Sequence, residues 1–165
     1  MKIVRDWLFK ILLLSSIPAL ASSSAALFGG FESKPEKGQI SFSNPGYEIS
    51  HILKDGASFI KPEMEGAGSK SEPGQPDLPT MSTYYAVEPG KIFTINASIK
   101  ESEVIENVEV VPFETWNSQP TGVIEKGVTY QQSSSFPANI ATVSDPMVFR
   151  DIVMVQVSVT PFQYN

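Results

Sequence analysis

Few side chains in this sequence could act as catalytic groups. The 165 residues include one histidine, His51, and no cysteine. Without cysteine the chain offers neither a thiol nucleophile nor thiolate metal ligands. A Ser-His-Asp arrangement would have to use Ser50, but neighbouring residues of a strand point to opposite faces of a sheet. We therefore interpret His51 as an ordinary strand or surface histidine without the partners of a metal site.

Carboxylates are the second kind of candidate catalytic group. Four of them lie close together in sequence: Glu101, Glu103, Glu106 and Glu109. Alternation puts Glu103 and Glu109 on the polar face of a predicted strand, with Glu106 opposite. Catalysis by two carboxylates needs them within several ångströms of each other in a cleft, which a solvated strand face does not provide. We predict surface carboxylates and no cofactor, with a weak calcium site and a carboxylate-based enzyme as less favoured alternatives.

The composition indicates an acidic, folded domain. Hydrophobic residues make up 41% of the chain and charged residues 18%, which is enough apolar material for a packed core. A length of 165 residues suits one domain. The formal net charge is −6. Because phosphate binding relies on clustered lysines and arginines, we exclude nucleic acid as a partner.

The first residues have the pattern of a cleavable signal peptide, which we place at 1–21. Basic residues precede an apolar run at 11–17, and Ala19 and Ala21 form the small-x-small pattern of a cleavage site. A cut a few residues later, at 24–26, is the alternative. The apolar run is shorter than the ~20 residues that span a bilayer. We expect export to the outside or surface of the cell and no stable membrane insertion after cleavage.

The exported part is predicted to be all-β, with a flexible N-terminal segment at 22–38 and an antiparallel β-sandwich domain at 39–165. Two or three short strands joined by tight turns are expected between residues 39 and 61. Period-2 alternation marks further strands at 92–99, 103–111 and 153–159. Short strands separated by Gly and Pro turns, with no convincing helix, are typical of an antiparallel sandwich.

These patterns also predict which side chains share a face. At 92–99 the alternation predicts a half-buried strand. At 103–111 it places Val104, Val108 and Val110 together on one face. The valines at odd positions from 153 to 159 form a third apolar face.

Several short motifs follow one another through the predicted domain. A G-x-P-x-L-P stretch at 74–79 leads into an apolar strand that ends at Pro-Gly. Then come "VVPFETW", Phe136-Pro137 and finally "FRDIVMVQVSVTPFQYN". The motif residues are Gly74, Pro76, Leu78, Pro79, Pro89, Gly90, Pro112, Arg150, Asp151, Pro161, Gln163, Tyr164 and Asn165.

In order and spacing, this series resembles the N-terminal propeptide domain of gingipain-like cysteine peptidases, over roughly residues 40–165. The resemblance implies a β-sandwich-like domain made in one chain with a caspase-fold catalytic domain. Such a propeptide covers the active-site cleft, keeps the zymogen latent, helps the peptidase to fold and is cut away on activation. The implied partner is the catalytic domain, in cis or in trans. No catalytic cysteine is present, so we expect this chain by itself not to be an enzyme.

The resemblance also implies an inhibitory contact, a basic side chain on a loop that enters the specificity pocket of the peptidase. No motif aligns that residue here. By position we assign it to Lys126, the only Lys or Arg between Trp116 and Phe136. An ordinary lysine at a hairpin tip is the other interpretation.

The sequence leaves two points open, the extent of the gene and the function of the domain. The family pattern usually continues past the position of Asn165 into a proline and the catalytic domain, so a fragment of a longer frame, a truncated gene and a free-standing inhibitor are all possible. The alternative function is a secreted binding or adhesion module for carbohydrate or protein. Its candidate sugar-stacking aromatics are Tyr84, Tyr85, Trp116, Tyr130 and Tyr164.

Overall fold

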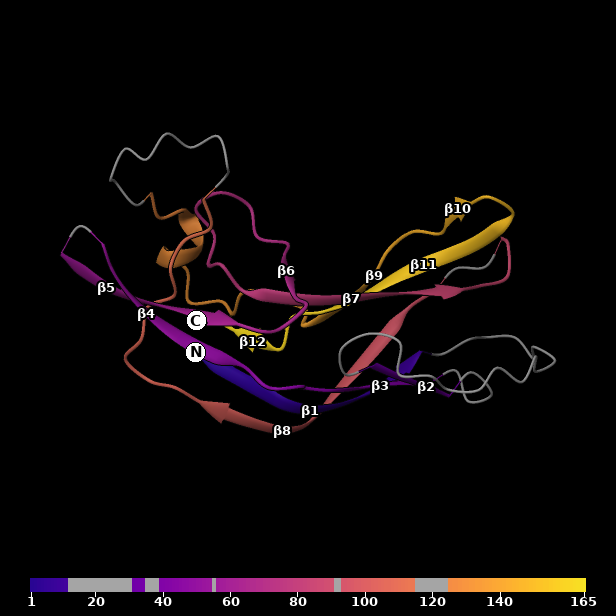
Figure 1. Cartoon of the computed structure of the whole chain (residues 1–165), viewed down its shortest axis with the longest axis horizontal. Helices are drawn as coiled ribbons and strands as arrows, with labels where there is room; N and C mark the ends of the chain where they lie inside the picture. The colour runs from indigo at the N-terminus through magenta and orange to yellow at the C-terminus, as the bar shows by residue number, and fades with distance from the viewer. Residues whose placement is uncertain (12–30, 35–38, 55, 91–92, 115–124) are drawn as a thin grey trace.

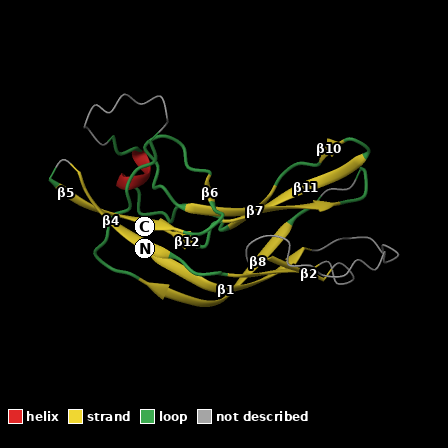
Figure 2. Ribbon diagram, viewed as in Figure 1, coloured by secondary structure: helices red, strands yellow, loops and turns green. Residues whose placement is uncertain are grey.

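A computed structural model describes residues 1–11, 31–34, 39–54, 56–90, 93–114 and 125–165 (Figure 1). Its strands are β1 (Lys2–Ile11), β2 (Phe31–Lys34), β3 (Gln39–Ser43), β4 (Glu48–Lys54), β5 (Ala57–Glu63), β6 (Gly68–Ser69), β7 (Pro79–Ala86), β8 (Ile95–Val104), β9 (Ala141–Val143), β10 (Met147–Phe149), β11 (Ile152–Val159) and β12 (Phe162–Gln163). The helical element in the described part is a short 3-10 turn at Val128–Gln131 (Figure 2). All paired strands are antiparallel, which confirms the predicted all-β class.

The first sheet is organised around β1. One edge of β1 pairs with β12 near its start and with β3 further along, and β2 extends the sheet beyond β3. The other edge pairs with β8 over almost the whole length of both strands. β1 is therefore an inner strand of this sheet (Figure 1).

The second sheet is organised around β11. One edge of β11 pairs with β7, which also pairs with β6, and the other edge pairs with β10 and β9 in turn. A separate hairpin, β4–β5, turns at Gly56 and projects from one end of the molecule (Figure 1). The two larger sheets thus form the layers of the predicted sandwich.

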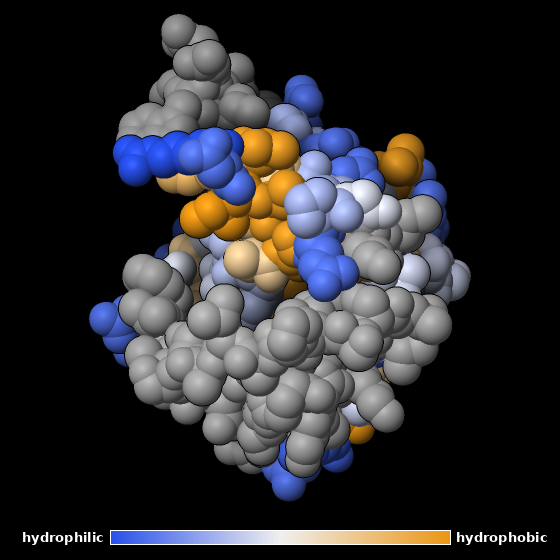
Figure 3. All heavy atoms as spheres, turned by 90° about the vertical axis from the view of Figure 1, so that its right-hand side faces the viewer, coloured by the Kyte–Doolittle hydropathy of each residue, from blue (hydrophilic) through white to orange (hydrophobic). Residues whose placement is uncertain are grey.

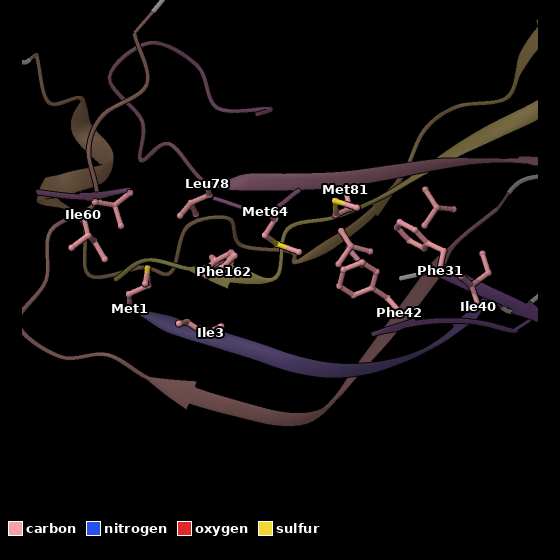
Figure 4. Close-up of a cluster of buried hydrophobic side chains, with 14 residues drawn as sticks. Met1, Ile3, Phe31, Ile40, Phe42, Ile60, Met64, Leu78, Met81 and Phe162 are labelled. Carbon is pink, nitrogen blue, oxygen red and sulfur yellow. The ribbon is translucent and has the colours of Figure 1, made fainter. Parts of the chain in front are cut away.

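The core lies between these sheets and draws on both. The first sheet contributes Met1, Ile3, Ile40, Phe42 and Phe162, all nearly or fully buried, as Figure 4 shows. Facing them are residues from the second sheet and from loop segments, among them Leu78, Met81, Val110, Val157 and Val159. Each large apolar side chain buried in this way contributes ~1.5–3 kcal/mol.

The burial predictions had different outcomes. In β11 three of the four predicted valines, Val155, Val157 and Val159, are at most 2% exposed, but Val153 is only partly buried and Ser158 is 3% exposed, so the alternation holds only in part. Within 92–99 a strand begins at Ile95, but β8 is not half-buried: Ile99 is 38% exposed, and every residue of β8 after Ile95 is exposed.

The predicted strand at 103–111 is wrong beyond its first residues. Val104 is 61% exposed whereas Val110 is fully buried, so the two do not share a face. The reason is a break in the extended backbone: β8 ends at Val104, and Asn107 has a φ of 57°, in the left-handed region. From Glu109 onward the chain pairs with other partners.

The N-terminal residues are integrated into the fold. Met1 is 6% exposed and Ile3 is fully buried. The α-amino group of Met1 donates to the Ile105 carbonyl at 2.8 Å, and burial lowers its pKa. Residues predicted to start a signal peptide therefore form β1, while Ala19 and Ala21 lie outside the described residues, and cleavage there stays a prediction. Within the segment predicted to be flexible, residues 31–34 form β2.

Candidate functional site

Two motifs far apart in sequence lie side by side. Gly74 donates its amide hydrogen to the Phe113 carbonyl, and the Phe113 amide donates to the Gln75 carbonyl, at 3.0 and 2.7 Å. Pro76 lies opposite Pro112 in an isolated bridge. The segment around Pro112 also pairs with β5, because the Val111 amide donates to the Ile60 carbonyl. The G-x-P-x-L-P stretch therefore helps to fix the loop that follows β8.

Gly74 makes a second contact that only a glycine allows. Its φ is 83°, and its carbonyl accepts a hydrogen bond from the Gly127 amide at 2.8 Å. A Cβ on Gly74 would lie 3.1 Å from the Gly127 nitrogen. Both the backbone conformation and the close approach therefore require glycine here. This contact positions the segment that carries Lys126, and the sequence pattern gave no indication of it.

Lys126 lies against the surface of its own domain. Its Nζ is 2.6 Å from Glu109 Oε1 and lies 5.1 Å from the Phe59 ring centroid and 5.9 Å from that of Tyr130. The lysine side chain remains 37% exposed. The ammonium is thus held by a carboxylate and two aromatic faces, at a position from which it can still reach a partner.

The aromatic residues near Lys126 are structural. Tyr130 donates its hydroxyl to the Val110 carbonyl at 2.7 Å, and its ring contacts that of Tyr164 at 5.3 Å between centroids. Burial raises the pKa of both hydroxyls. Tyr85 is partly buried too, and burial raises its pKa to about 12. These three rings do not offer open faces for sugar stacking.

Tyr84 is the exposed tyrosine among the described candidates, at 55%. Its hydroxyl accepts a hydrogen bond from Gln156 Nε2 at 3.1 Å. Trp116 lies outside the described residues. One exposed ring is a weak basis for a carbohydrate site, which normally combines stacking with several polar contacts.

The C-terminal motif is also tied into the sandwich. The Phe136 amide donates to the Tyr164 carbonyl, and the Tyr164 amide donates to the Phe136 carbonyl, at 2.7 and 2.8 Å. Gln163 donates through Nε2 to the Pro137 carbonyl. Pro161 is buried and Asn165 is exposed. These residues join the end of the chain to the Phe136-Pro137 motif.

The remaining motif residues lie in turns or in the core. Leu78 and Pro79 are buried where β7 begins, and Pro89-Gly90 form the turn after β7, with Gly90 at a φ of 76°. Arg150 and Asp151 form the exposed turn between β10 and β11. Arg150 has a φ of 55°, which suits a tight reversal.

The β10–β11 turn is surrounded by exposed apolar side chains. We call this set the hairpin patch: Val148 is 71% exposed, Phe149 61% and Ile152 52%. The Arg150 guanidinium lies 5.6 Å from the Phe149 ring centroid. Figure 3 looks at the end of the molecule that carries this hairpin, and hydrophobic surface faces the viewer there. Clustered exposed apolar side chains of this kind commonly mark protein-binding surfaces.

The other chemical candidates do not assemble into a site. Ser50 donates its hydroxyl to Glu63 Oε2 at 3.1 Å instead of approaching His51, which lies exposed on β4. Glu101 and Glu103 lie exposed on β8, while Glu109 is paired with Lys126. In the described residues no group of three or more His, Cys, Asp or Glu could hold a metal ion. Nor does this part of the chain contain a helix with the length and apolar character of a membrane span.

Comparison with known proteins supplies the family. The Propeptide_C25 family model matches residues 32–165. Gingipain R1 of Porphyromonas gingivalis is 34% identical over 101 residues, which is 58% of this chain and 10% of the relative. Gingipain R2 of Porphyromonas gingivalis strain ATCC BAA-308 / W83 is 31% identical over 106 residues, covering 58% of this chain and 14% of the relative. The chain thus spans a small part of the length of these relatives.

Solved structures agree on the fold. A structure of the complex of Porphyromonas gingivalis RgpB pro- and mature domains matches with a TM-score of 0.66 at 22% identity, over 94% of this chain and 75% of the other. A structure on the zymogenic latency of gingipain K from Porphyromonas gingivalis matches with a TM-score of 0.60 at 20% identity, over 76% and 74%. The family model is that of a propeptide and not of a catalytic domain. The chain belongs to the Propeptide_C25 family and is a gingipain-like propeptide domain.

Proposed function

We propose that this domain is the propeptide of a gingipain-like cysteine peptidase precursor, in which it keeps the catalytic domain latent and assists its folding. The observation that carries the proposal is the family match over residues 32–165. The partner is the catalytic domain, reached in cis within the precursor or in trans after cleavage. The signal-peptide pattern at 1–21, with cleavage after Ala21, supports export to the outside or surface of the cell.

A latency domain works through surface complementarity, so it needs no nucleophile of its own. Lys126 is the candidate for the specificity pocket. To enter a pocket it has to leave Glu109 and the two rings. An exposed ion pair contributes ~0.2–1 kcal/mol and an exposed cation–π contact ~0.5–1 kcal/mol. A carboxylate in the specificity pocket of a Lys- or Arg-specific peptidase can compensate for losses of that size. The internal contacts therefore hold Lys126 against its own domain but do not prevent it from binding in the pocket.

The hairpin patch is a second candidate contact with the catalytic domain. It combines exposed apolar area with a cation, Arg150, at the tip of a hairpin. Aromatic and arginine side chains are enriched among residues that dominate binding energy. Arg150 is therefore a second candidate, beside Lys126, for the residue that enters the specificity pocket.

Inhibition constants of single variants distinguish the two cations. We expect Lys126→Ala to weaken inhibition of the mature peptidase by about 100-fold, as for a dominant interface residue. Arg150→Ala should then have a smaller effect. Lys100→Ala, on the exposed face of β8, is the matched control and should change nothing. If Lys126→Ala and the wild-type domain inhibit equally well, Lys126 does not bind in the specificity pocket. A large loss of inhibition for Arg150→Ala would indicate that Arg150 binds there instead.

A further inference from the structure

The inner strand of the first sheet is made from residues that the signal-peptide pattern assigns to the leader. β1 spans Lys2–Ile11, and cleavage after Ala21 would remove all of it. Along one edge, β1 pairs with β12 and β3, and along the other with β8. In the described residues β8 pairs with no strand besides β1. Removal of the leader would therefore leave two unpaired edges facing each other.

These two edges would lie two strand spacings apart, roughly 10 Å, which is too far for hydrogen bonds between them. β3 and β8 are each antiparallel to β1, so they run parallel to one another across the gap. β8 has little core packing to hold it, since Ile95 packs against the core and every residue after it is exposed. The gap would also remove Met1 and Ile3 from contact with the core. Unpaired edges next to an open apolar space form an acceptor for another strand.

The geometry of the chain ends indicates which strand that is. In β12, Gln163 pairs with Lys2 and Phe162 pairs with Ile3, so the last strand of the chain lies beside the start of β1. Figure 1 shows the two termini next to each other. A chain that turned after β12 through a hairpin loop of ~2–5 residues would run antiparallel to β12, in the direction of β1. It would enter the gap at the level of Lys2 and continue between β3 and β8.

We propose that the β1 position is an exchangeable strand site, and that after leader removal the segment directly following Asn165 in the precursor occupies it. This inference rests on the proposed function, because only a precursor that continues past Asn165 has such a segment. The segment should be an extended stretch of ~10 residues, the length of β1, with apolar side chains where Ile3 and Met1 now contact the core. Before the leader is cleaved, β1 occupies this site in place of that segment.

Occupation of the β1 position by this segment would affect latency. The segment after Asn165 belongs to the connection between the propeptide and the catalytic domain of the precursor. If that segment completes the first sheet, the fold of the propeptide and the position of the junction are coupled. A leader-free domain cut at Asn165 would lack its inner strand and would be a poorer inhibitor than one that retains the segment.

Hydrogen exchange on the leader-free precursor tests the site without any peptidase assay. We expect the β8 amides that point towards the β1 position, every second one along the strand, to be protected in the natural precursor. Two prolines placed within the ten residues after Asn165 should lower β8 protection by about ten-fold or more, because proline cannot donate to a sheet. The β7 and β11 amides serve as the internal control and should keep their protection, since β1 does not pair with them.

A second arm covers the case in which the proline variant does not fold. Residues 22–165 alone should show unprotected β8 amides, and a synthetic peptide of residues 1–11 should restore their protection. The same fragment, extended by the twenty residues that follow Asn165 in the precursor, should show the same protection of the β8 amides without the peptide. Full β8 protection in 22–165 alone, or an extension that fails where the peptide succeeds, would overturn the proposal. Because hydrogen exchange needs no peptidase, it can show that the strand-exchange proposal is wrong independently of whether the domain inhibits the peptidase.

Discussion

The two sheets of this domain are held together in different ways. The β11 sheet is stabilised by side-chain burial: Val155, Val157 and Val159 are at most 2% exposed, and β7 beside them contributes Met81 to the core. In the β1 sheet, β8 has almost no buried side chains and depends on its backbone pairing with β1. A clear alternating pattern therefore predicts that a strand forms, but not that the strand is buried.

The difference also concerns where each sheet obtains its strands. Every strand of the β11 sheet comes from the part of the chain predicted to be exported. The β1 sheet takes its inner strand from residues 2–11, within the predicted leader. We infer that the first sheet is the one that can change on processing, and that the second is the constant part of the domain. Substitutions in the two sheets should therefore have unequal effects.

The largest stability effect is expected where the β1 sheet is anchored independently of β8. Phe162 of β12 is fully buried and contacts Tyr47 edge-on, with 5.5 Å between ring centroids. Phe162→Ala should lower the free energy of unfolding by ~3–5 kcal/mol, through lost burial and the cavity left behind. Urea denaturation measures the change. A loss below about 1 kcal/mol would mean that β12 is not part of the stable core.

The same substitution in each sheet gives a matched comparison. Val157→Ala in β11 removes fully buried methyl groups and should cost about 2 kcal/mol. Val104→Ala in β8 removes methyl groups from a side chain that is 61% exposed and should cost less than ~0.5 kcal/mol. Urea midpoints of the two variants provide the test. Equal costs would contradict the difference between the sheets.

Alkaline pH should destabilise the domain in part through ionisation of Tyr85, which lies in the β11 sheet. Burial raises the pKa of Tyr85 in β7 to about 12, above the ordinary value of 10.0. The folded state therefore holds this proton more tightly than the unfolded state does. The stabilising effect is complete below pH 10 and is lost as the pH rises from 10 towards 12. Thermal melts across this pH range should show a smaller loss of stability for Tyr85→Phe than for the wild-type protein.

Sequence patterns predicted the fold class and the β11 strand because alternation and turn residues are local signals. They could not predict that Val104 and Val110 separate, since the positive φ at Asn107 depends on the pairing partners of the residues after it. Residues 2–11 contain the basic start of the leader pattern, and the apolar residues between those basic residues also suit a strand. The pattern therefore could not reveal that this segment has a place in the sheet.

The candidate site was predictable to a smaller extent. The motif residues were found by order and spacing, but their meeting at Gly74, Pro76 and Pro112 is a long-range property. Lys126 was located by position, whereas its pairing with Glu109 depends on the Gly74–Gly127 contact. The hairpin patch was missed. Exposure of Val148 and Phe149 results from how β10 lies on the edge of β11, which composition does not encode.

We propose that this domain inhibits the catalytic domain of its own precursor. The most direct measurement is the inhibition constant of the leader-free domain, extended past Asn165 and checked by hydrogen exchange, against that mature peptidase. We predict an inhibition constant below ~1 μM, which corresponds to about −8 kcal/mol of binding free energy. A correctly folded domain that neither binds nor inhibits the peptidase, but binds a glycan, would contradict the claim and establish the adhesion alternative.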